Sequence, residues 1–293
     1  MSAERVVAVV VGTGSMGPEI AAALAGAGVE TRIAGRDAQR TVAAAARAAE
    51  LGGGCTVTPG PIAAATFAGA GLVVETIAED AAEKRALYAT VEPWCPADAV
   101  LATNTSSLRI ADLAQGVARP ARFAGFHFLK PAHLTGVVEV VPGPATAPEV
   151  TAALGDVAAR MGKTALVVRR DVPGFIWNRI QFAVLRECLH MLEEGVAGAA
   201  DIDAAVADGL APRWMAAGPL ATADLGGLAT FARICAGLFP HLAAGTEAPA
   251  AIVDAARDGE PLQAWTRSAG ADLDRLRAQA LAAGARITAE RRR

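Results

Sequence analysis

Short apolar runs divide the first half of the chain, and each is followed by a stretch with helical periodicity. Residues 6–11 form one such run, which is typical of a strand buried on both faces of a parallel sheet. The same pattern predicts strands at residues 30–34, 55–58, 72–75, 100–103 and 165–168, and helices at 18–27, 37–51, 63–68, 79–91 and 148–161. This alternation predicts an α/β fold with a Rossmann-type, doubly wound, mostly parallel sheet.

The second half of the chain shows helical periodicity only. A long helix is predicted at residues 175–194, with a wide apolar face that includes Ile180 and Phe182. Asp201 is predicted to cap another helix, Asp224 to open the next, and residues 272–283 to form the last. Since no strand pattern follows residue 168, we predict an all-helical C-terminal domain at 172–293 after a Rossmann domain at 1–171.

Composition and charge narrow the class of protein. The 293 residues are 53% hydrophobic and 19% charged, which is typical of a compact folded protein. A net charge of −3 argues against a general nucleic-acid or anionic-membrane binder, and the apolar runs are interrupted too early for a membrane span. The four cysteines are scattered without metal-ligand spacing. We therefore expect a cytoplasmic protein with reduced thiols and no metal.

A glycine-rich turn follows the first predicted strand directly and precedes a helix. Its sequence, Gly12-Thr13-Gly14-Ser15-Met16-Gly17, has the spacing G-x-G-x-x-G. Gly12 allows a tight turn, Gly14 lets the backbone approach a pyrophosphate, and Gly17 lets the helix pack closely on the strand. In this context the motif predicts a dinucleotide site that also includes Ser15 and Met16. A glycine-rich turn without a ligand is the alternative.

The end of the second predicted strand bears on the type of dinucleotide. An NAD site usually has an acidic side chain, which binds the ribose hydroxyls, at the position held here by Gly35. The acid is missing, and Arg36 lies beside the gap, where it is suited to a 2′-phosphate. Asp37 is then expected to cap the following helix. We therefore predict a preference for NADP(H) over NAD(H).

His127 and Glu139 suggest acid–base chemistry. Each lies at the edge of an apolar run with a strand pattern. A histidine whose ring is held by a carboxylate is a ready general acid or base near neutral pH. The alternative is a partly buried histidine that is satisfied by hydrogen bonds. Ser106 follows another strand end, where ligands of open α/β sheets bind, and a simple helix cap is its alternative role.

Spaced motifs occur in one order along the chain, at residues 12–17, Glu79 with Lys84, 104–108, 123–128, 138–140 and 171–179. Together they resemble the 3-hydroxyacyl-CoA dehydrogenase family over roughly residues 6–230. The resemblance implies a catalytic pair at His127 and Glu139, a ligand of the substrate oxygen at Ser106, and a residue completing the polar cluster at Asn178. It also implies that Glu79 and Lys84 lie near the nicotinamide end of the cofactor, and Asn104 belongs to the same cofactor site.

The chain departs from the family pattern at two places. Lys130 stands where the family usually has asparagine, three residues after His127. Its ammonium could bind a substrate carboxylate or repel a protonated His127, and the alternative is a side chain that extends into solvent. Residues 37–54 also lack the long basic helical arm of acyl-CoA members. A small 3-oxo or 3-hydroxy acid, a carrier-bound acyl group or another carbonyl or imine is therefore favoured over a free CoA thioester.

Residues 209–214 and 218–220 are similar to the λ-crystallin/L-gulonate 3-dehydrogenase branch of the family, which acts on small free hydroxy acids. Trp214 and Met215 are candidates for the substrate pocket, with an interface or core role as the alternative. The resemblance also implies a homodimer formed through the helical domain. We predict an NADP(H)-dependent oxidoreductase of a 3-hydroxy or 3-oxo acid or acyl group. A reductase of another carbonyl or an imine, and a catalytically silent NADP(H)-binding or structural protein, are the alternatives.

Overall fold

The computed structural model describes residues 7–263 and 270–291, so Val6 of the first predicted strand lies outside the described residues. Residue contacts divide the chain into two units, Met1–Arg179 and Ile180–Arg293. This division falls after the domain boundary predicted at residue 171, which stays a prediction. Each unit is considered by itself below.

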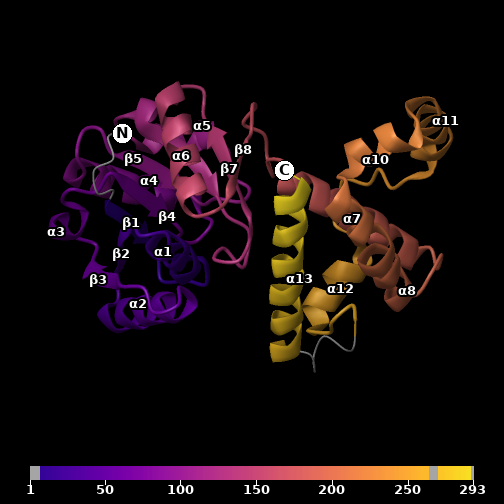
Figure 1. The fold of residues 1–293 in the computed structure, drawn as a ribbon, viewed down its shortest axis with the longest axis horizontal. Coiled ribbons are helices and arrows are strands. Elements are labelled where there is room, and N and C mark those ends of the chain that lie inside the picture. The colour runs from indigo at the N-terminus through magenta and orange to yellow at the C-terminus, as the bar shows by residue number, and fades with distance from the viewer. Residues whose placement is uncertain (1–6, 264–269, 292–293) are drawn as a thin grey trace. The chain divides into compact units, whose positions relative to one another are not determined.

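The described part of the first unit contains an eight-stranded sheet in the order β3-β2-β1-β4-β5-β6-β7-β8 (Figure 1). Its strands are β1 Val7–Val11, β2 Glu30–Gly35, β3 Val57–Pro61, β4 Leu72–Glu75, β5 Val100–Thr103, β6 Phe123–His127, β7 Val137–Pro142 and β8 Thr164–Val167. Neighbouring strands pair in parallel except β6 and β7, which are antiparallel. The predicted mostly parallel sheet is confirmed.

β3 is the strand whose predicted position was wrong, since it begins at Val57 and not at Cys55. The thiol of Cys55 lies 3.7 Å from the carbonyl oxygen of Ala48 and packs against the preceding helix instead. β3 pairs with β2 only, and an edge strand tolerates proline, so Pro59 and Pro61 fall within it.

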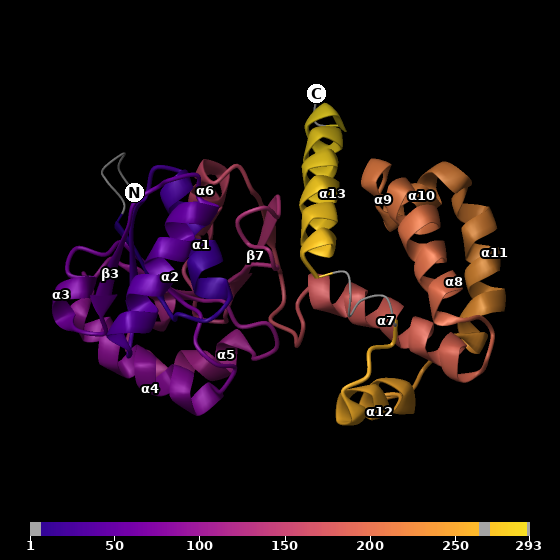
Figure 2. The same ribbon diagram turned by 90° about the horizontal axis from the view of Figure 1, so that it is seen from below.

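Helices cover both faces of the sheet and divide its core into two layers. α1 Met16–Gly26, α2 Ala38–Leu51 and α6 Pro148–Arg160 pack on one face, around residues such as Ile20, Ala48 and Leu154. α3 Ala64–Phe67, α4 Ala81–Val91 and α5 Ile110–Leu113 pack on the other, around Phe67 and Tyr88. Figure 2 shows α4 and α5 on one side of the first unit and α6 on the other. The only helix between β2 and β3 is α2, so the described chain has no long arm there.

The order of the strands reverses at β1, whose neighbours are β2 and β4. In open α/β sheets ligands bind at such a switch point, beyond the carboxyl ends of the strands. Gly12 follows β1, Thr76 follows β4 and Asn104 follows β5. The fold therefore brings the glycine-rich turn and the polar strand ends to one edge of the sheet.

The described part of the second unit contains helices and no strand. α7 Trp177–Glu193 enters this unit and is followed by α8 Ala199–Ala204, a π-helical turn at Ala205–Leu210, α9 Ala211–Ala216, α10 Pro219–Gly226, α11 Leu228–Leu238, α12 Ala250–Asp258 and α13 Gly270–Arg291. The predicted all-helical half is confirmed.

Two helix starts in this unit were predicted wrongly. Asp201 lies in the first turn of α8, whose N-cap is Gly198. Asp224 lies near the end of α10, and Gly227, with φ of 89°, separates that helix from α11. In both cases a glycine marks the boundary. Gly227 is left-handed, a conformation that aspartate rarely adopts, whereas Gly198 is in the extended conformation usual for an N-cap residue. No helix in residues 7–263 or 270–291 is long and apolar enough to cross a membrane.

Candidate active site

The glycine-rich turn leaves room for a ligand at Gly14, whereas Gly12 and Gly17 are closely packed against their neighbours. Gly12 has φ of 130°, and a Cβ there would overlap Thr76. A Cβ at Gly17 would overlap the carbonyl oxygen of Gly12, so the helix packs against the turn as the motif predicts. At Gly14, by contrast, a Cβ would meet no atom within 4 Å. The backbone at Gly14 is open to a phosphate, in front of the first turn of α1.

A cavity of about 240 Å³ extends from this turn to the end of β2. Its lining includes Gly12, Gly14, Gly35, Arg36 and Arg40. A Cβ at Gly35 would lie 2.6 Å from the Cγ2 atom of Thr13 and overlap the Thr41 hydroxyl, so this position has no space for an acid. The open turn and the adjoining cavity fit a dinucleotide. Ser15 is exposed beside Gly14, whereas Met16 packs against the core.

Two of the cavity residues refine the prediction made from the sequence. Asp37 caps α2, as expected, by accepting a hydrogen bond from the amide of Arg40 at 2.7 Å. Arg40 was missed, although its place one helical turn after Arg36 was a signal that could have revealed it. Arg36 and Arg40 are both exposed, and both line this cavity.

Glu79 organises the turn that follows β5. Its Oε1 atom accepts hydrogen bonds from the Thr105 hydroxyl at 2.6 Å and from the amides of Ser106 and Ser107 at 2.8 and 3.0 Å. The hydroxyls of both serines also donate to Oε1, at 3.2 and 3.1 Å. Burial raises the pKa of Glu79, but these hydrogen bonds and the charge of Lys84 lower it further, to about 2. The carboxylate therefore stays ionised and fixes Ser106.

Lys84 is buried beneath this turn. Its side chain is 1% exposed, and its Nζ atom lies 2.6 Å from Glu75 Oε1 and 3.4 Å from Glu79 Oε2. The wholly buried Glu75 also accepts from the hydroxyls of Tyr88 and Thr103, at 2.7 and 2.8 Å. Burial and the charge of Glu75 raise the pKa of Tyr88. The Lys84 ammonium is thus engaged by two carboxylates, and its predicted contact with a cofactor stays a prediction.

Glu75 was not predicted as part of the site. An acid at the end of the apolar strand Leu72–Glu75 was the signal that could have revealed it, because a buried charge needs partners.

His127 and Glu139 face one another across the antiparallel pair β6 and β7. They are direct register partners, and His127 Nδ1 lies 2.6 Å from Glu139 Oε2. Both side chains are buried, with 4% and 0% exposed. Burial raises the pKa of Glu139, but the hydrogen bonds from His127 and from the amides of Trp177 and Ile176 lower it more. An ionised carboxylate only accepts hydrogen bonds, so Nδ1 carries the proton and Nε2 is the free nitrogen.

The segment before α7 completes the surroundings of this pair. The amides of Ile176 and Trp177 each donate to Glu139 Oε1 at 2.8 Å. The Asn178 side chain donates to the backbone carbonyl oxygen of Ser106 at 3.1 Å. The structure therefore brings Asn178 next to Ser106 and joins β5, β7 and the start of α7 in one polar cluster. Backbone amides have no sequence signature, and the two that hold Glu139 were missed.

The remaining predicted residues differ in their surroundings. Asn104 Oδ1 accepts from the amide of Phe128 at 2.8 Å and so holds the backbone next to His127. Lys130 is exposed. Trp214 is half-buried and Met215 is 38% exposed in α9 of the second unit. The roles of Lys130, Trp214 and Met215 in substrate binding stay predictions.

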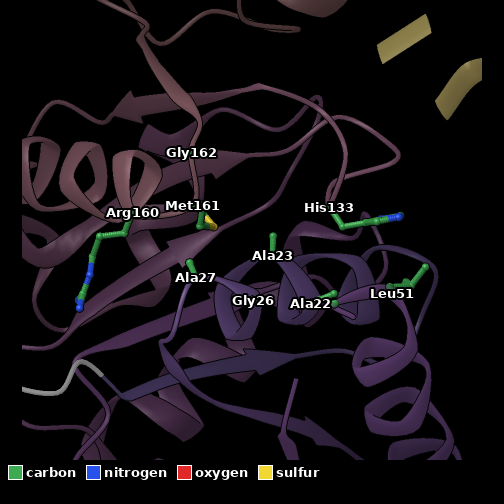
Figure 3. A pocket seen from close by; sticks show the side chains of 10 residues that line it. Ala22, Ala23, Gly26, Ala27, Leu51, His133, Arg160, Met161 and Gly162 are labelled. Carbon is green, nitrogen blue, oxygen red and sulfur yellow. The ribbon is translucent and has the colours of Figure 1, made fainter. Parts of the chain in front are cut away.

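A second cavity, of about 390 Å³, lies at the C-terminal ends of α1, α2 and α6. Figure 3 shows its lining, with Arg160 and His133 at opposite ends and pointing away from each other. α1 runs from Met16 at the glycine-rich turn to Gly26 at this cavity, and 11 residues span roughly 16 Å. The cavity is therefore separate from the cluster around His127. Among the described residues no group of three or more histidines, cysteines or acids is arranged to hold a metal ion.

Comparison with known proteins identifies the family. The family model described as "3-hydroxyacyl-CoA dehydrogenase, NAD binding domain" matches residues 57–172, and the corresponding C-terminal domain matches residues 174–263. The chain is also 31% identical over 232 residues to 5-formyl-3-hydroxy-2-methylpyridine 4-carboxylate 5-dehydrogenase of Mesorhizobium japonicum, which covers 75% of each protein. The chain belongs to the 3-hydroxyacyl-CoA dehydrogenase family. The predicted family and its nicotinamide-dinucleotide-binding domain are thereby confirmed.

Two further relatives extend this result. L-carnitine dehydrogenase of Streptomyces griseus is 34% identical over 226 residues, which are 77% of this chain and 62% of that enzyme. The crystal structure of 5-formyl-3-hydroxy-2-methylpyridine 4-carboxylic acid 5-dehydrogenase, described as an NAD+ dependent dismutase, superposes with a TM-score of 0.89 at 28% identity and covers 96% of this chain and 97% of that one. The protein is therefore a dehydrogenase-type oxidoreductase of this family. Its assignment to the λ-crystallin branch stays a prediction.

Proposed function

We propose that the protein interconverts a hydroxyl and a carbonyl group on a small 3-hydroxy or 3-oxo acid, with His127 as the general acid and base. The observation that carries this proposal is the 2.6 Å contact between His127 Nδ1 and Glu139 Oε2. Glu139 fixes the ring through Nδ1, so Nε2 is left to exchange a proton with a substrate oxygen.

The chemistry divides between the cofactor and the side chains. A nicotinamide cofactor, when bound, supplies or accepts hydride at the substrate carbon. In reduction, His127 donates a proton to the oxygen as negative charge develops there, and in oxidation it takes that proton away. Asn178, whose amide donates to the Ser106 carbonyl oxygen at 3.1 Å, has a second N–H suited to the same substrate oxygen, and the Ser106 hydroxyl can donate to it by turning away from Glu79; neither group changes charge. Glu139 stabilises the imidazolium while the proton resides on His127.

The proposed cofactor is NADP(H) in preference to NAD(H). Support comes from the cavity at the end of β2, where Gly35 has no space for an acid and the arginines Arg36 and Arg40 line the wall. A hydrogen bond to a charged group contributes about 1.5–3 kcal/mol, so Arg36→Ala should raise the KM for NADPH roughly 10- to 100-fold and leave the KM for NADH nearly unchanged. Arg47→Ala, which removes an exposed arginine of α2 outside the cavity lining, is the matched control. A wild-type preference for NADH would refute this assignment, and the solved relative named as NAD+ dependent makes the measurement necessary.

The connection between β2 and β3 favours a small substrate. Its one described helix is α2, so it lacks the long basic arm expected of acyl-CoA members. Two relatives that match about three quarters of this chain, the pyridine carboxylate dehydrogenase and L-carnitine dehydrogenase, have names without CoA, whereas a solved 3-hydroxybutyryl-CoA dehydrogenase covers 81% of it at 25% identity. A carrier-bound acyl group stays the larger alternative to a small free acid. Exposed Lys130 is the proposed partner of the substrate carboxylate.

The experiment is to follow NADPH and NADH absorbance against a panel of free 3-oxo acids, 3-oxoacyl thioesters, aldehydes bearing a carboxylate, and cyclic imines. Turnover of a 3-oxo acid that is lost in His127→Gln would support the proposal. Turnover of imines alone would replace it with the reductase alternative. Tight cofactor binding with no turnover of any compound would identify a catalytically silent protein.

A second candidate function is an oxidoreductase of an aldehyde. One observation favours it: the solved structure with a TM-score of 0.89 over nearly the whole chain is described as a dismutase whose named substrate bears a formyl group. Oxidised and reduced products in equal amounts from one aldehyde, at catalytic cofactor concentration, would identify this activity.

We also propose a homodimer formed through the second unit. Its support is a set of exposed apolar side chains, with Leu220 84%, Leu225 83%, Leu228 63% and Phe239 63% exposed. Phe182 on α7, predicted within an apolar face, is 57% exposed as well. Several of these side chains lie on the successive helices α10 and α11, and contiguous exposed apolar surface is typical of interfaces. Sedimentation equilibrium tests the proposal, and a monomer at micromolar concentration would refute it.

A further inference from the structure

The segment 174–176, which leads from β8 into α7, has an unusual backbone. Gly174 and Phe175 are both left-handed, with φ of 76° and 50°. Glycine adopts this conformation freely, but a bulky residue with positive φ is uncommon and strained. Among residues 7–263 and 270–291, Phe175 is the one non-glycine residue with positive φ. Strain of this kind persists where the surroundings hold it in place, and it is concentrated at functional sites.

The turn at Phe175 aims the next two amides at one oxygen. Ile176 N and Trp177 N, which follow directly, both donate to Glu139 Oε1 at 2.8 Å. Trp177 is also the first residue of α7, so Glu139 accepts its hydrogen bonds at the positive end of a 17-residue helix. A glycine at position 175 would make the same turn without strain, and the turn by itself therefore does not explain the phenylalanine.

The ring of Phe175 meets the other member of the pair. It is 1% exposed and lies in the apolar cluster that includes Val141 and Val168. Its centroid lies 5.6 Å from that of His127, with the ring planes at 61°, an edge-to-face arrangement. One residue thus contacts His127 through its side chain and directs the amides that hold Glu139 through its backbone.

We propose that Phe175 is a positioning residue for the acid–base pair: its ring keeps the imidazole in the orientation that gives Nδ1 to Glu139, and its left-handed backbone holds the carboxylate in place. This inference rests on the proposed role of His127. It assigns no contact with substrate to Phe175. It accounts for a strained aromatic residue at a place where glycine would suffice.

The test compares Phe175→Gly and Phe175→Leu with the wild-type enzyme. The glycine variant keeps the turn and loses the ring, whereas the leucine variant keeps apolar bulk and loses the flat edge. Phe67→Leu is the matched control, because Phe67 is buried in the same apolar cluster but pairs with Trp94 at 5.7 Å. Denaturant unfolding identifies conditions in which all four proteins are folded.

The first readout is independent of activity. Nitrogen-15 NMR of the imidazoles, with the His127 signals assigned by His127→Gln, reports which ring nitrogen carries the proton. Wild type and Phe67→Leu should show a protonated Nδ1 in slow exchange with water. Phe175→Gly should show faster exchange and a mixture of tautomers, with Phe175→Leu between them. Wild-type signals in both Phe175 variants would overturn the inference.

The second readout is turnover with a substrate identified by the panel. Misplacing a catalytic group by about 1 Å can reduce turnover roughly 100-fold, so we expect kcat to fall about 10- to 100-fold in Phe175→Gly while the KM for the cofactor is unchanged. A loss of kcat equal to that of Phe67→Leu would overturn the positioning role. If the NMR signals change as expected but no compound is turned over by the wild type, the proposed function fails and the structural inference stands.

Discussion

Two regions of the first unit use the same arrangement of hydrogen bonds around a carboxylate. After β4, Glu79 accepts from the consecutive amides of Ser106 and Ser107 through one oxygen, and its other oxygen faces Lys84. In β7, Glu139 accepts from the consecutive amides 176 and 177 through one oxygen, and its other oxygen faces His127.

The cation in each region makes the difference. Lys84 is 1% exposed and is held by a second carboxylate, Glu75, at 2.6 Å, so its ammonium is a fixed charge. In His127 only Nδ1 faces the carboxylate, so Nε2 is left for the proposed proton exchange. In both regions backbone amides hold one carboxylate oxygen, and we propose that the paired cation, a buried lysine or a histidine, distinguishes a structural site from a catalytic one.

The largest expected effect is a loss of turnover when His127 is replaced. His127→Gln should reduce kcat by about 10²-fold or more, the usual contribution of a general acid or base, while the protein stays folded. Steady-state kinetics with the substrate found by the panel measures this. His133→Gln, a half-buried histidine that lines the second cavity, is the control. Near wild-type turnover in His127→Gln would show that the pair of His127 and Glu139 is not catalytic.

The second prediction compares the loss of folding stability when Lys84 or His127 is replaced. Lys84→Gln should lower the free energy of unfolding by about 3–5 kcal/mol, because removing one partner of a buried ion pair leaves the other charge uncompensated. Denaturant unfolding of wild type, Lys84→Gln and His127→Gln measures the difference. A loss in His127→Gln as large as that in Lys84→Gln would mean that both regions are structural.

The third prediction concerns the two carboxylates. Glu139→Gln keeps the shape but removes the charge opposite His127, and a hydrogen bond to a charged group contributes about 1.5–3 kcal/mol. We expect kcat to fall roughly 10- to 100-fold. Glu79→Gln should reduce kcat less, because Glu79 acts on Ser106 and not on His127. Equal losses in the two variants would contradict the distinction.

The fourth prediction uses neighbouring serines that contact the same oxygen. Ser106 and Ser107 each donate an amide and a hydroxyl to Glu79 Oε1. Removing a neutral hydrogen bond costs about 0.5–1.5 kcal/mol, so Ser106→Ala should lower kcat/KM about 2- to 10-fold if its hydroxyl also binds the substrate oxygen. Ser107→Ala should leave kcat/KM unchanged. Identical kinetics in the two variants would assign both hydroxyls to the turn alone.

The smallest expected effect is on the pH dependence of stability. The pKa of Glu79 is lowered from 4.5 to about 2 in the folded chain, so the unfolded chain binds its proton first as the pH falls. The stabilisation from Glu79 is complete above about pH 4.5 and is lost as the pH falls toward 2. The difference in unfolding free energy between wild type and Glu79→Gln should shrink over this window. A constant difference would mean that Glu79 is not held as a carboxylate.

The elements with strong local patterns could be predicted from the sequence. The apolar run before Gly12 and the spacing of Gly12, Gly14 and Gly17 indicated β1, the turn and α1. The Asp37 cap was predicted because a capping side chain acts on residues close to it in sequence. The proximity of His127 to Glu139 was also expected, although its cause, the antiparallel register of β6 and β7, was not.

The features that the sequence did not reveal depend on distant backbone. The amides of Ile176 and Trp177 carry no side-chain signal, and the left-handed Phe175 reads as an ordinary apolar residue. Lys84 was expected near the nicotinamide end of the cofactor, but its ion pair with the buried Glu75 on β4 was not expected. In each case the partner lies on another element, so residue type alone did not identify the contact.

The antiparallel pairing of β6 with β7 has a consequence for how this enzyme can diversify. His127 and Glu139 meet because they are opposite each other in the ladder. Within residues 128–136, Phe128 and Ala132 are buried in the core, whereas Lys130 and Leu134 are exposed, so these two side chains can be exchanged while the pair keeps its register. A library randomised at Lys130 and Leu134 is therefore a way to select new substrates while the proposed proton-transfer pair stays unchanged.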